Sequence, residues 1–109
     1  MNLVSNEKVL NNFNKENNDI LLSVIIPCFN EIKTLEEVIK KVKNSPISPK
    51  EIIIIDDYST DGSREFLSNL KDELITIKFH KCNKGKGAAL NTGFKSAKGK
   101  IVIIQDADL

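Results

Sequence analysis

Cysteine and histidine are scarce in this chain of 109 residues, which has two cysteines and one histidine. Cys28 and Cys82 are far apart and form no CxxC or Cys/His spacing, so we expect reduced thiols rather than a metal site. Because His80 is alone, a metal site built on several histidines cannot be assembled.

Arginine is also scarce, since Arg64 is the only one. This argues against a phosphate-binding surface made of bidentate guanidinium groups. The net charge of +1 gives no general attraction to nucleic acid or to anionic membranes. We therefore expect no nucleic-acid partner.

Long apolar runs are missing as well. No stretch approaches the roughly 18 residues of a membrane span, and no basic-then-apolar leader opens the chain. We expect a soluble, cytoplasmic domain; a full-length protein could still be membrane-associated through residues outside this chain.

The pattern of the chain changes near residue 21. Residues 1–20 are polar, with seven asparagines, and are expected to form a mobile tail. Short apolar runs and amphipathic stretches then alternate, which predicts strands at 21–27, 51–56, 74–80 and 100–106 and helices at 31–45, 63–71 and 85–99, the last ending at Gly99. The order β-α-β-α-β-α-β predicts a doubly wound α/β fold with a parallel sheet and flanking helices.

Polar clusters follow all four expected strands: "PCFNE", "DDYSTDG", "NKGKG" and "DAD". In such sheets ligands bind beyond the carboxyl ends of the strands, near the point where strand order reverses. The four clusters together therefore predict one binding site.

Two acids, Asp56 and Asp57, follow the apolar run "IIII" of the second strand. One acid would be enough to cap the next helix, whereas adjacent acids in an extended chain face opposite ways, so that one can turn inward while the other faces a ligand. Both interpretations stay open, and a ligand is favoured.

Asp106 and Asp108 alternate, so both carboxylates project to the same side of an extended segment. Their repulsion is relieved by a divalent cation or a shared proton, and Mg²⁺ or Mn²⁺ bound by two carboxylates completes its shell with water and phosphate oxygens. The alternative is a solvated turn.

The glycine-rich stretch "NKGKGAALNTG" matches neither a P-loop nor a GxGxxG motif. Its glycines are expected to permit a tight turn from strand to helix, and Lys84 and Lys86 are more often solvated than ligand-bound. By themselves, Pro27 could simply end a strand and Glu31 could simply favour the positive end of a helix.

Taken together, "SVIIPCFNE", "IIIIDDYSTDG", "NKGKGAALNTGF" and "IVIIQDADL" resemble the family 2 glycosyltransferases over residues 22–109. The resemblance is strongest to the branch with dolichyl-phosphate mannose synthase and bacterial polyprenyl-phosphate sugar transferases. It implies a Rossmann-like fold of the GT-A type and transfer of a sugar from a GDP- or UDP-sugar.

The resemblance also implies roles for individual residues. Those expected to bind the nucleotide sugar are Pro27, Phe29, Glu31, Ile55, Asp57, Asp106, Ala107 and Asp108. Among these, Asp57 is expected to contact the base, and Asp106 and Asp108 are expected to hold the catalytic Mg²⁺ or Mn²⁺ in a DxD motif. The family often has tyrosine where this chain has Phe29, so stacking survives while a hydroxyl contact is lost.

The resemblance further implies an acceptor, expected to be a polyprenyl or dolichyl phosphate at the membrane surface. Residues 21–109 match only the donor-binding half of the family's domain, so the chain looks partial. Three alternatives stay open: a catalytically incomplete nucleotide-binding fragment, a nucleotidyltransferase and a Mg²⁺-binding receiver-like domain.

Overall fold

The computed structural model describes residues 20–108. The expected tail at 1–20 therefore lies almost wholly outside the described residues. The elements follow the expected order: β1 (Leu22–Cys28), α2 (Ile32–Asn44), β2 (Lys50–Asp56), α3 (Ser63–Ser68), β3 (Ile75–Phe79), α4 (Lys86–Ser96) and β4 (Ile101–Ile104).

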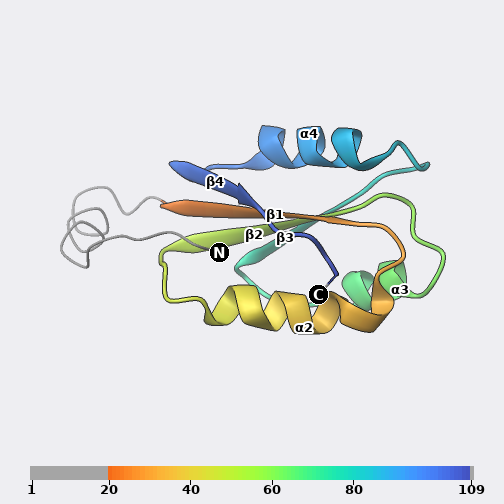
Figure 1. The fold of residues 1–109 in the computed structure, drawn as a ribbon, viewed down its shortest axis with the longest axis horizontal. Coiled ribbons are helices and arrows are strands. Elements are labelled where there is room, and N and C mark those ends of the chain that lie inside the picture. Colours follow the sequence, from red (N-terminus) through yellow and green to blue (C-terminus); the bar gives the residue numbers. More distant parts are fainter. Residues whose placement is uncertain (1–19, 109) are drawn as a thin grey trace.

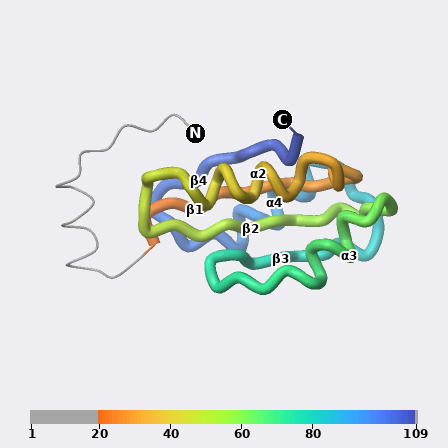
Figure 2. The backbone as a smooth tube through the Cα atoms, turned by 90° about the horizontal axis from the view of Figure 1, so that it is seen from below, coloured from red at the N-terminus to blue at the C-terminus, as the bar shows by residue number. Residues whose placement is uncertain are grey.

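The four strands form one parallel sheet in the order β3-β2-β1-β4. Figure 2 shows them side by side in that order. The chain moves outward from β1 through β2 to β3 and then returns to the other side of β1, so strand order reverses between β1 and β4. This confirms the prediction of a Rossmann-like α/β fold and places the switch point beside Cys28.

Helices cover both faces of the sheet, with α4 on one side and α2 and α3 on the other (Figure 1). The alternation along each strand explains this, because successive side chains point to opposite faces. Val24, Ile26, Ile52 and Ile54 belong to the core beneath α2, whereas Ile25, Ile53 and Ile55 belong to the core beneath α4.

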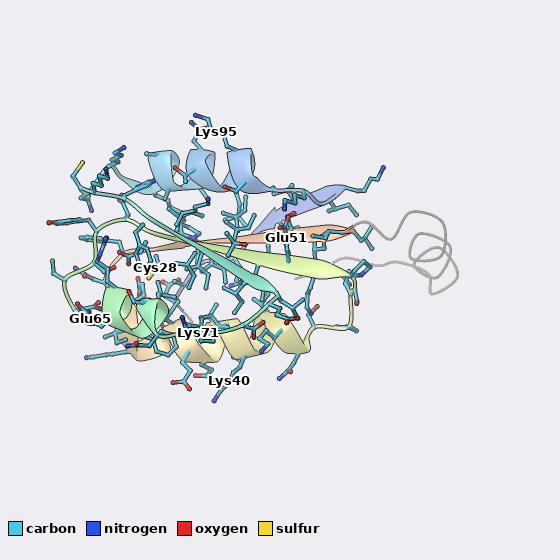
Figure 3. The ribbon with its side chains drawn as sticks, turned by 180° about the vertical axis from the view of Figure 1, so that it is seen from behind. Cys28, Lys40, Glu51, Glu65, Lys71 and Lys95 are labelled. Carbon is cyan, nitrogen blue, oxygen red and sulfur yellow. The ribbon has the colours of Figure 1, made fainter. Side chains whose placement is uncertain are left out.

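The helix α2 buries Leu35, Val38, Ile39 and Val42 against the sheet. Ile32, which was expected on this apolar face, is 36% exposed at the first turn. Charged side chains lie on the outer faces of the helices: in Figure 3, Lys40 on α2 and Lys95 on α4 project away from the sheet. The amphipathic pattern thus predicts the buried face of α2 well except at its beginning.

Gly99 has a different role from the expected one. The helix α4 ends at Ser96 with Ala97 as its C-cap, and Gly99 is not in the left-handed conformation of a helix stop. Instead, a Cβ atom at Gly99 would lie 2.7 Å from the backbone nitrogen of Ser23. The glycine is required because the chain entering β4 passes directly against β1.

Candidate functional site

A pocket of about 430 Å³ lies at the carboxyl ends of β1, β2 and β4. It is lined by Pro27, Cys28, Phe29, Glu31, Asp57, Asn83, Gly85, Lys86, Ala89, Asp106, Ala107 and Asp108. Residues from all four polar clusters of the sequence are present in this lining. The fold therefore brings the clusters together at the switch point, as the sequence predicts.

Seven of the eight expected site residues line the pocket, and Ile55 does not. The Ile55 side chain is fully buried in the core beneath α4. The reason is the alternation of β2, which directs Ile55 toward α4. The structure assigns Ile55 to the core rather than to the wall of the pocket.

The two acids at the end of β2, Asp56 and Asp57, face different surroundings, as the alternation predicts. The Asp56 carboxylate is fully buried and accepts hydrogen bonds from Arg64 Nη1 at 3.1 Å and from the backbone N–H of Ser59 at 3.1 Å. It does not cap α3, whose N-cap is Gly62. Asp56 therefore holds the loop after β2, and Asp57 faces the pocket.

Asp57 accepts three hydrogen bonds although it is only 3% exposed. Its Oδ1 faces His80 Nδ1 at 2.8 Å and accepts from the Lys84 N–H at 2.9 Å, and its Oδ2 accepts from the Gly85 N–H at 2.8 Å. Burial by itself would raise the pKa of Asp57, but these hydrogen bonds outweigh it and lower the pKa below its ordinary value. The carboxylate therefore stays charged, and one of its roughly four acceptor positions is left for a ligand.

The loop between β3 and α4 is held by Asp57. Besides the two backbone bonds to the carboxylate, Asn83 Nδ2 donates to the Asp57 carbonyl oxygen at 3.3 Å. Gly85 has φ of +93°, a conformation that favours glycine. Gly85 thus permits the entry into α4, for which it is the N-cap, and Lys86 follows it at the pocket.

The acids after β4 are exposed at the mouth of the pocket. Asp106 and Asp108 flank the buried Ala107, and both line the pocket. Lys86 Nζ donates to Asp106 Oδ1 at 2.8 Å, and this contact raises the pKa of Lys86. Lys86 is exposed, as expected of a solvated lysine, and it pairs with Asp106 at the same time.

Thr34 of α2 fixes the position of the segment between these acids. Its Oγ1 donates to the Ala107 carbonyl oxygen at 2.7 Å, across 73 positions of sequence. The first turn of α2 is itself held by Asp61, which accepts from the Ile32 N–H at 3.0 Å. Nothing in the sequence pattern distinguishes Thr34 from other polar residues of an amphipathic helix.

Cys28 lines the pocket but does not provide a nucleophile. Both cysteines are free, as expected, and Figure 3 shows the Cys28 side chain in the interior near α3. Burial, together with the charge of Asp56, raises the pKa of the Cys28 thiol to about 11. The thiol is therefore protonated at neutral pH and a poor nucleophile.

Phe29 and Glu31, which follow β1, form another part of the pocket wall. The Phe29 ring is 46% exposed, and Glu31 is half-buried at the beginning of α2. The pocket thus combines an exposed ring, a buried charged acceptor and a pair of exposed carboxylates. This combination at a switch point defines a candidate ligand-binding site in a protein of the doubly wound α/β class.

The comparison with known families names the particular family. The family model described as glycosyl transferase family 2 matches residues 23–109. The chain belongs to this family, and the receiver-like and nucleotidyltransferase alternatives are thereby replaced.

Two curated relatives illustrate the similarity. An uncharacterized glycosyltransferase of Rickettsia conorii is 43% identical over 91 residues, which cover 84% of this chain and 15% of the relative. A cholesterol galactosyltransferase of Borreliella burgdorferi is 41% identical over 88 residues, which cover 80% of this chain and 25% of that protein. The chain thus spans a quarter or less of the length of these relatives.

Solved structures agree with the fold. The mannosyltransferase PcManGT from Pyrobaculum calidifontis, in complex with GDP-Man and Mn²⁺, is 31% identical with a TM-score of 0.72, covering 83% of this chain and 28% of that one. TarS 1-349 of S. aureus in complex with UDP is 25% identical with a TM-score of 0.74, covering 81% and 27% respectively. The sheet and helices are those of the GT-A glycosyltransferases.

Within the described residues, no helix is long and apolar enough to cross a membrane.

Proposed function

We propose that the chain carries the donor site of a glycosyltransferase, which binds a nucleoside diphosphate sugar in the pocket beside Asp57 and Asp106. The single observation that carries this proposal is the pocket itself, in which seven of the eight expected donor-site residues converge. The neighbours solved with GDP-Man and with UDP support a nucleotide-sugar donor.

The base would lie between Phe29 and Asp57. The exposed Phe29 ring offers a stacking surface, and stacking on an aromatic side chain contributes about 1–3 kcal/mol per base in single-stranded nucleic-acid sites. Asp57 has one acceptor position free for a ring N–H, and its charge strengthens that hydrogen bond. Pro27 and Glu31 would complete the ribose side of the pocket.

The residues at the other end of the pocket suit a divalent cation. Asp106 and Asp108 supply carboxylate oxygens, which Mg²⁺ and Mn²⁺ prefer, and Asp106 already accepts a cationic partner in Lys86. Among the described residues, no group of three potential ligands surrounds a single point. A cation bound there would take one or two carboxylates from the chain and complete its shell with water and substrate phosphates.

Asp106 and Asp108 would hold the cation beside the diphosphate. When bound, the cation supplies positive charge that stabilises the negative charge growing on the leaving nucleoside diphosphate. Lys86 places a second positive charge at the same end of the pocket, and Thr34 keeps the Ala107 backbone, and with it both acids, in place. We propose that Asp106 and Asp108 are the catalytic residues of this chain.

The acceptor is proposed from the resemblance to the polyprenyl-phosphate branch alone. A polyprenyl phosphate oxygen is anionic near neutral pH, so its attack needs little help from a general base. The test is transfer of a radiolabelled sugar by the full-length protein to polyprenyl phosphate, with the uncharged polyprenol as control. Equal transfer to both lipids would contradict the role of the phosphate.

The donor site is tested by calorimetric titration of UDP and GDP with and without Mn²⁺. Metal and nucleotide should each tighten the other by the same factor, because linkage is reciprocal. Asp108→Asn keeps the size and removes a charge, so it should abolish this coupling. The matched control is Glu36→Gln, which removes an exposed charge on α2. Equal metal dependence in the parent and Asp108→Asn would mean that the acid pair is a solvated turn.

A further inference from the structure

His80, the only histidine of the chain, is buried beside the pocket but does not line it. It follows β3 directly, and its ring lies between two side chains from other elements. Nδ1 is 2.8 Å from Asp57 Oδ1, and Nε2 is 2.8 Å from Thr92 Oγ1 on α4. The imidazole therefore connects the end of β2 to α4.

The direction of the bond to Asp57 follows from what each group can donate. An ionised carboxylate only accepts, so His80 must donate its Nδ1–H to Asp57. The Thr92 hydroxyl has one hydrogen and two neighbours, His80 Nε2 and the Ala88 carbonyl oxygen at 3.1 Å. Whichever neighbour receives that hydrogen, the Nδ1–H bond to Asp57 is unchanged.

This bond restrains rotation of the Asp57 carboxylate. Oδ1 has two donors, His80 and the Lys84 N–H, while Oδ2 has the Gly85 N–H alone. The main chain of His80 is held as well, because its N–H donates to the Asp56 carbonyl oxygen at 2.9 Å. The ring is thus a rigid donor, which leaves the free acceptor position of Asp57 pointing in one direction.

We propose that His80 is a positioning residue for base recognition: it orients Asp57 toward the nucleotide base without touching the ligand. The proposal rests on the donor site described above and deepens it. The effect should be confined to ligands that carry a base, because the hydrogen bonds to Asp106 and to the Ala107 carbonyl come from Lys86 and Thr34 rather than from His80.

Three variants separate orientation from packing. His80→Phe keeps the volume of the ring and removes both nitrogens. His80→Asn places an amide N–H at the same distance from the backbone as Nδ1 and so restores the donor to Asp57. Thr92→Val removes the hydroxyl that holds the far side of the ring while keeping the shape of the side chain.

The readouts are the Kd of UDP or GDP, whichever the parent protein binds more tightly, and the Kd of pyrophosphate, which has no base, both measured with Mn²⁺. His80→Phe should weaken nucleotide binding about tenfold, as expected for one charge-assisted hydrogen bond. Pyrophosphate binding should change by less than about twofold, and His80→Asn should recover most of the nucleotide affinity. Thr92→Val should weaken nucleotide binding by about threefold.

A folded His80→Phe protein with the parent's nucleotide affinity would overturn the proposal. An equal loss for pyrophosphate would also overturn it, because it would show a general structural role. If His80→Phe does not fold, the other two variants decide. The proposal is overturned if His80→Asn loses nucleotide affinity, or if Thr92→Val binds the nucleotide with the parent's Kd. A parent that binds neither nucleotide refutes the donor site itself, and this result is distinct because it precedes any variant.

Discussion

Replacing Asp57 with asparagine should destabilise the protein far more than acid-to-amide changes at exposed positions such as Asp108. Asparagine keeps one acceptor oxygen and puts an NH₂ group where the second oxygen was. If the oxygen stays with His80 and Lys84, two charge-assisted bonds become neutral, and each loses about 1 kcal/mol. The Gly85 N–H then faces another donor, and a buried polar group without a partner costs about 1–3 kcal/mol.

The sum predicts that Asp57→Asn lowers the free energy of unfolding by about 3–5 kcal/mol at pH 7. Little of this is lost to solvent screening, because the Asp57 side chain is only 5% exposed. The loss would be a large part of the roughly 5–15 kcal/mol that stabilises a typical domain. The assay is urea unfolding of the purified protein, followed by circular dichroism.

The pH dependence gives a second check. The pKa of Asp57 in the folded protein lies below its ordinary value of 3.8, so its stabilising effect is present above that value. It is lost as the pH falls through the folded pKa, so the difference between parent and Asp57→Asn should shrink below pH 3.8. The matched control is Asp108→Asn, an exposed acid whose loss should change stability by less than about 0.5 kcal/mol. Equal destabilisation by the two variants would refute the reasoning.

Two further predictions concern the surroundings of the pocket. Gly93→Ala should lower the free energy of unfolding by about 1–3 kcal/mol in urea unfolding, because its Cβ would lie 2.6 Å from Ile25 Cγ2. Gly87→Ala is the control, because open space surrounds Gly87 and the free energy of unfolding should not fall. Equal effects of the two substitutions would contradict the packing of α4. Thr34→Val should weaken Mn²⁺-dependent nucleotide binding severalfold in calorimetry, because Ala107 loses its hydrogen bond; an unchanged metal dependence would show that Thr34 does not position the acids.

The element order and the place of the site could be read from local patterns. Continuous apolar runs mark strands buried on both faces, and the spacing of Leu35, Val38 and Val42 marks a helix with one buried face. Such patterns are local, because each depends only on the residues within a strand or a few helical turns. The carboxyl ends of parallel strands meet at one edge of the sheet, so the polar clusters had to converge there.

The partners of individual side chains depended on the tertiary structure. Sequence indicated a ligand beside Asp57, but its bonds come from residues 23 to 28 positions away, whose approach depends on how β3 and α4 pack. The exclusion of a histidine-based metal site left His80 without a role, because the sequence does not show that it lies between Asp57 and Thr92.

Ile55 and Gly99 are two positions at which the sequence suggested one role and the tertiary structure gave another. Ile55 belongs to a recognisable motif, yet the alternation of β2 turns its side chain into the core beneath α4. Gly99 looks like a helix stop, yet what requires glycine there is the backbone of Ser23, 76 positions earlier. The sequence by itself determined the elements, their order and the edge where the site lies, since these follow from periodicity and chain direction. Only the tertiary structure decided which side chains face the pocket and what holds them, because those contacts join residues that are distant in sequence.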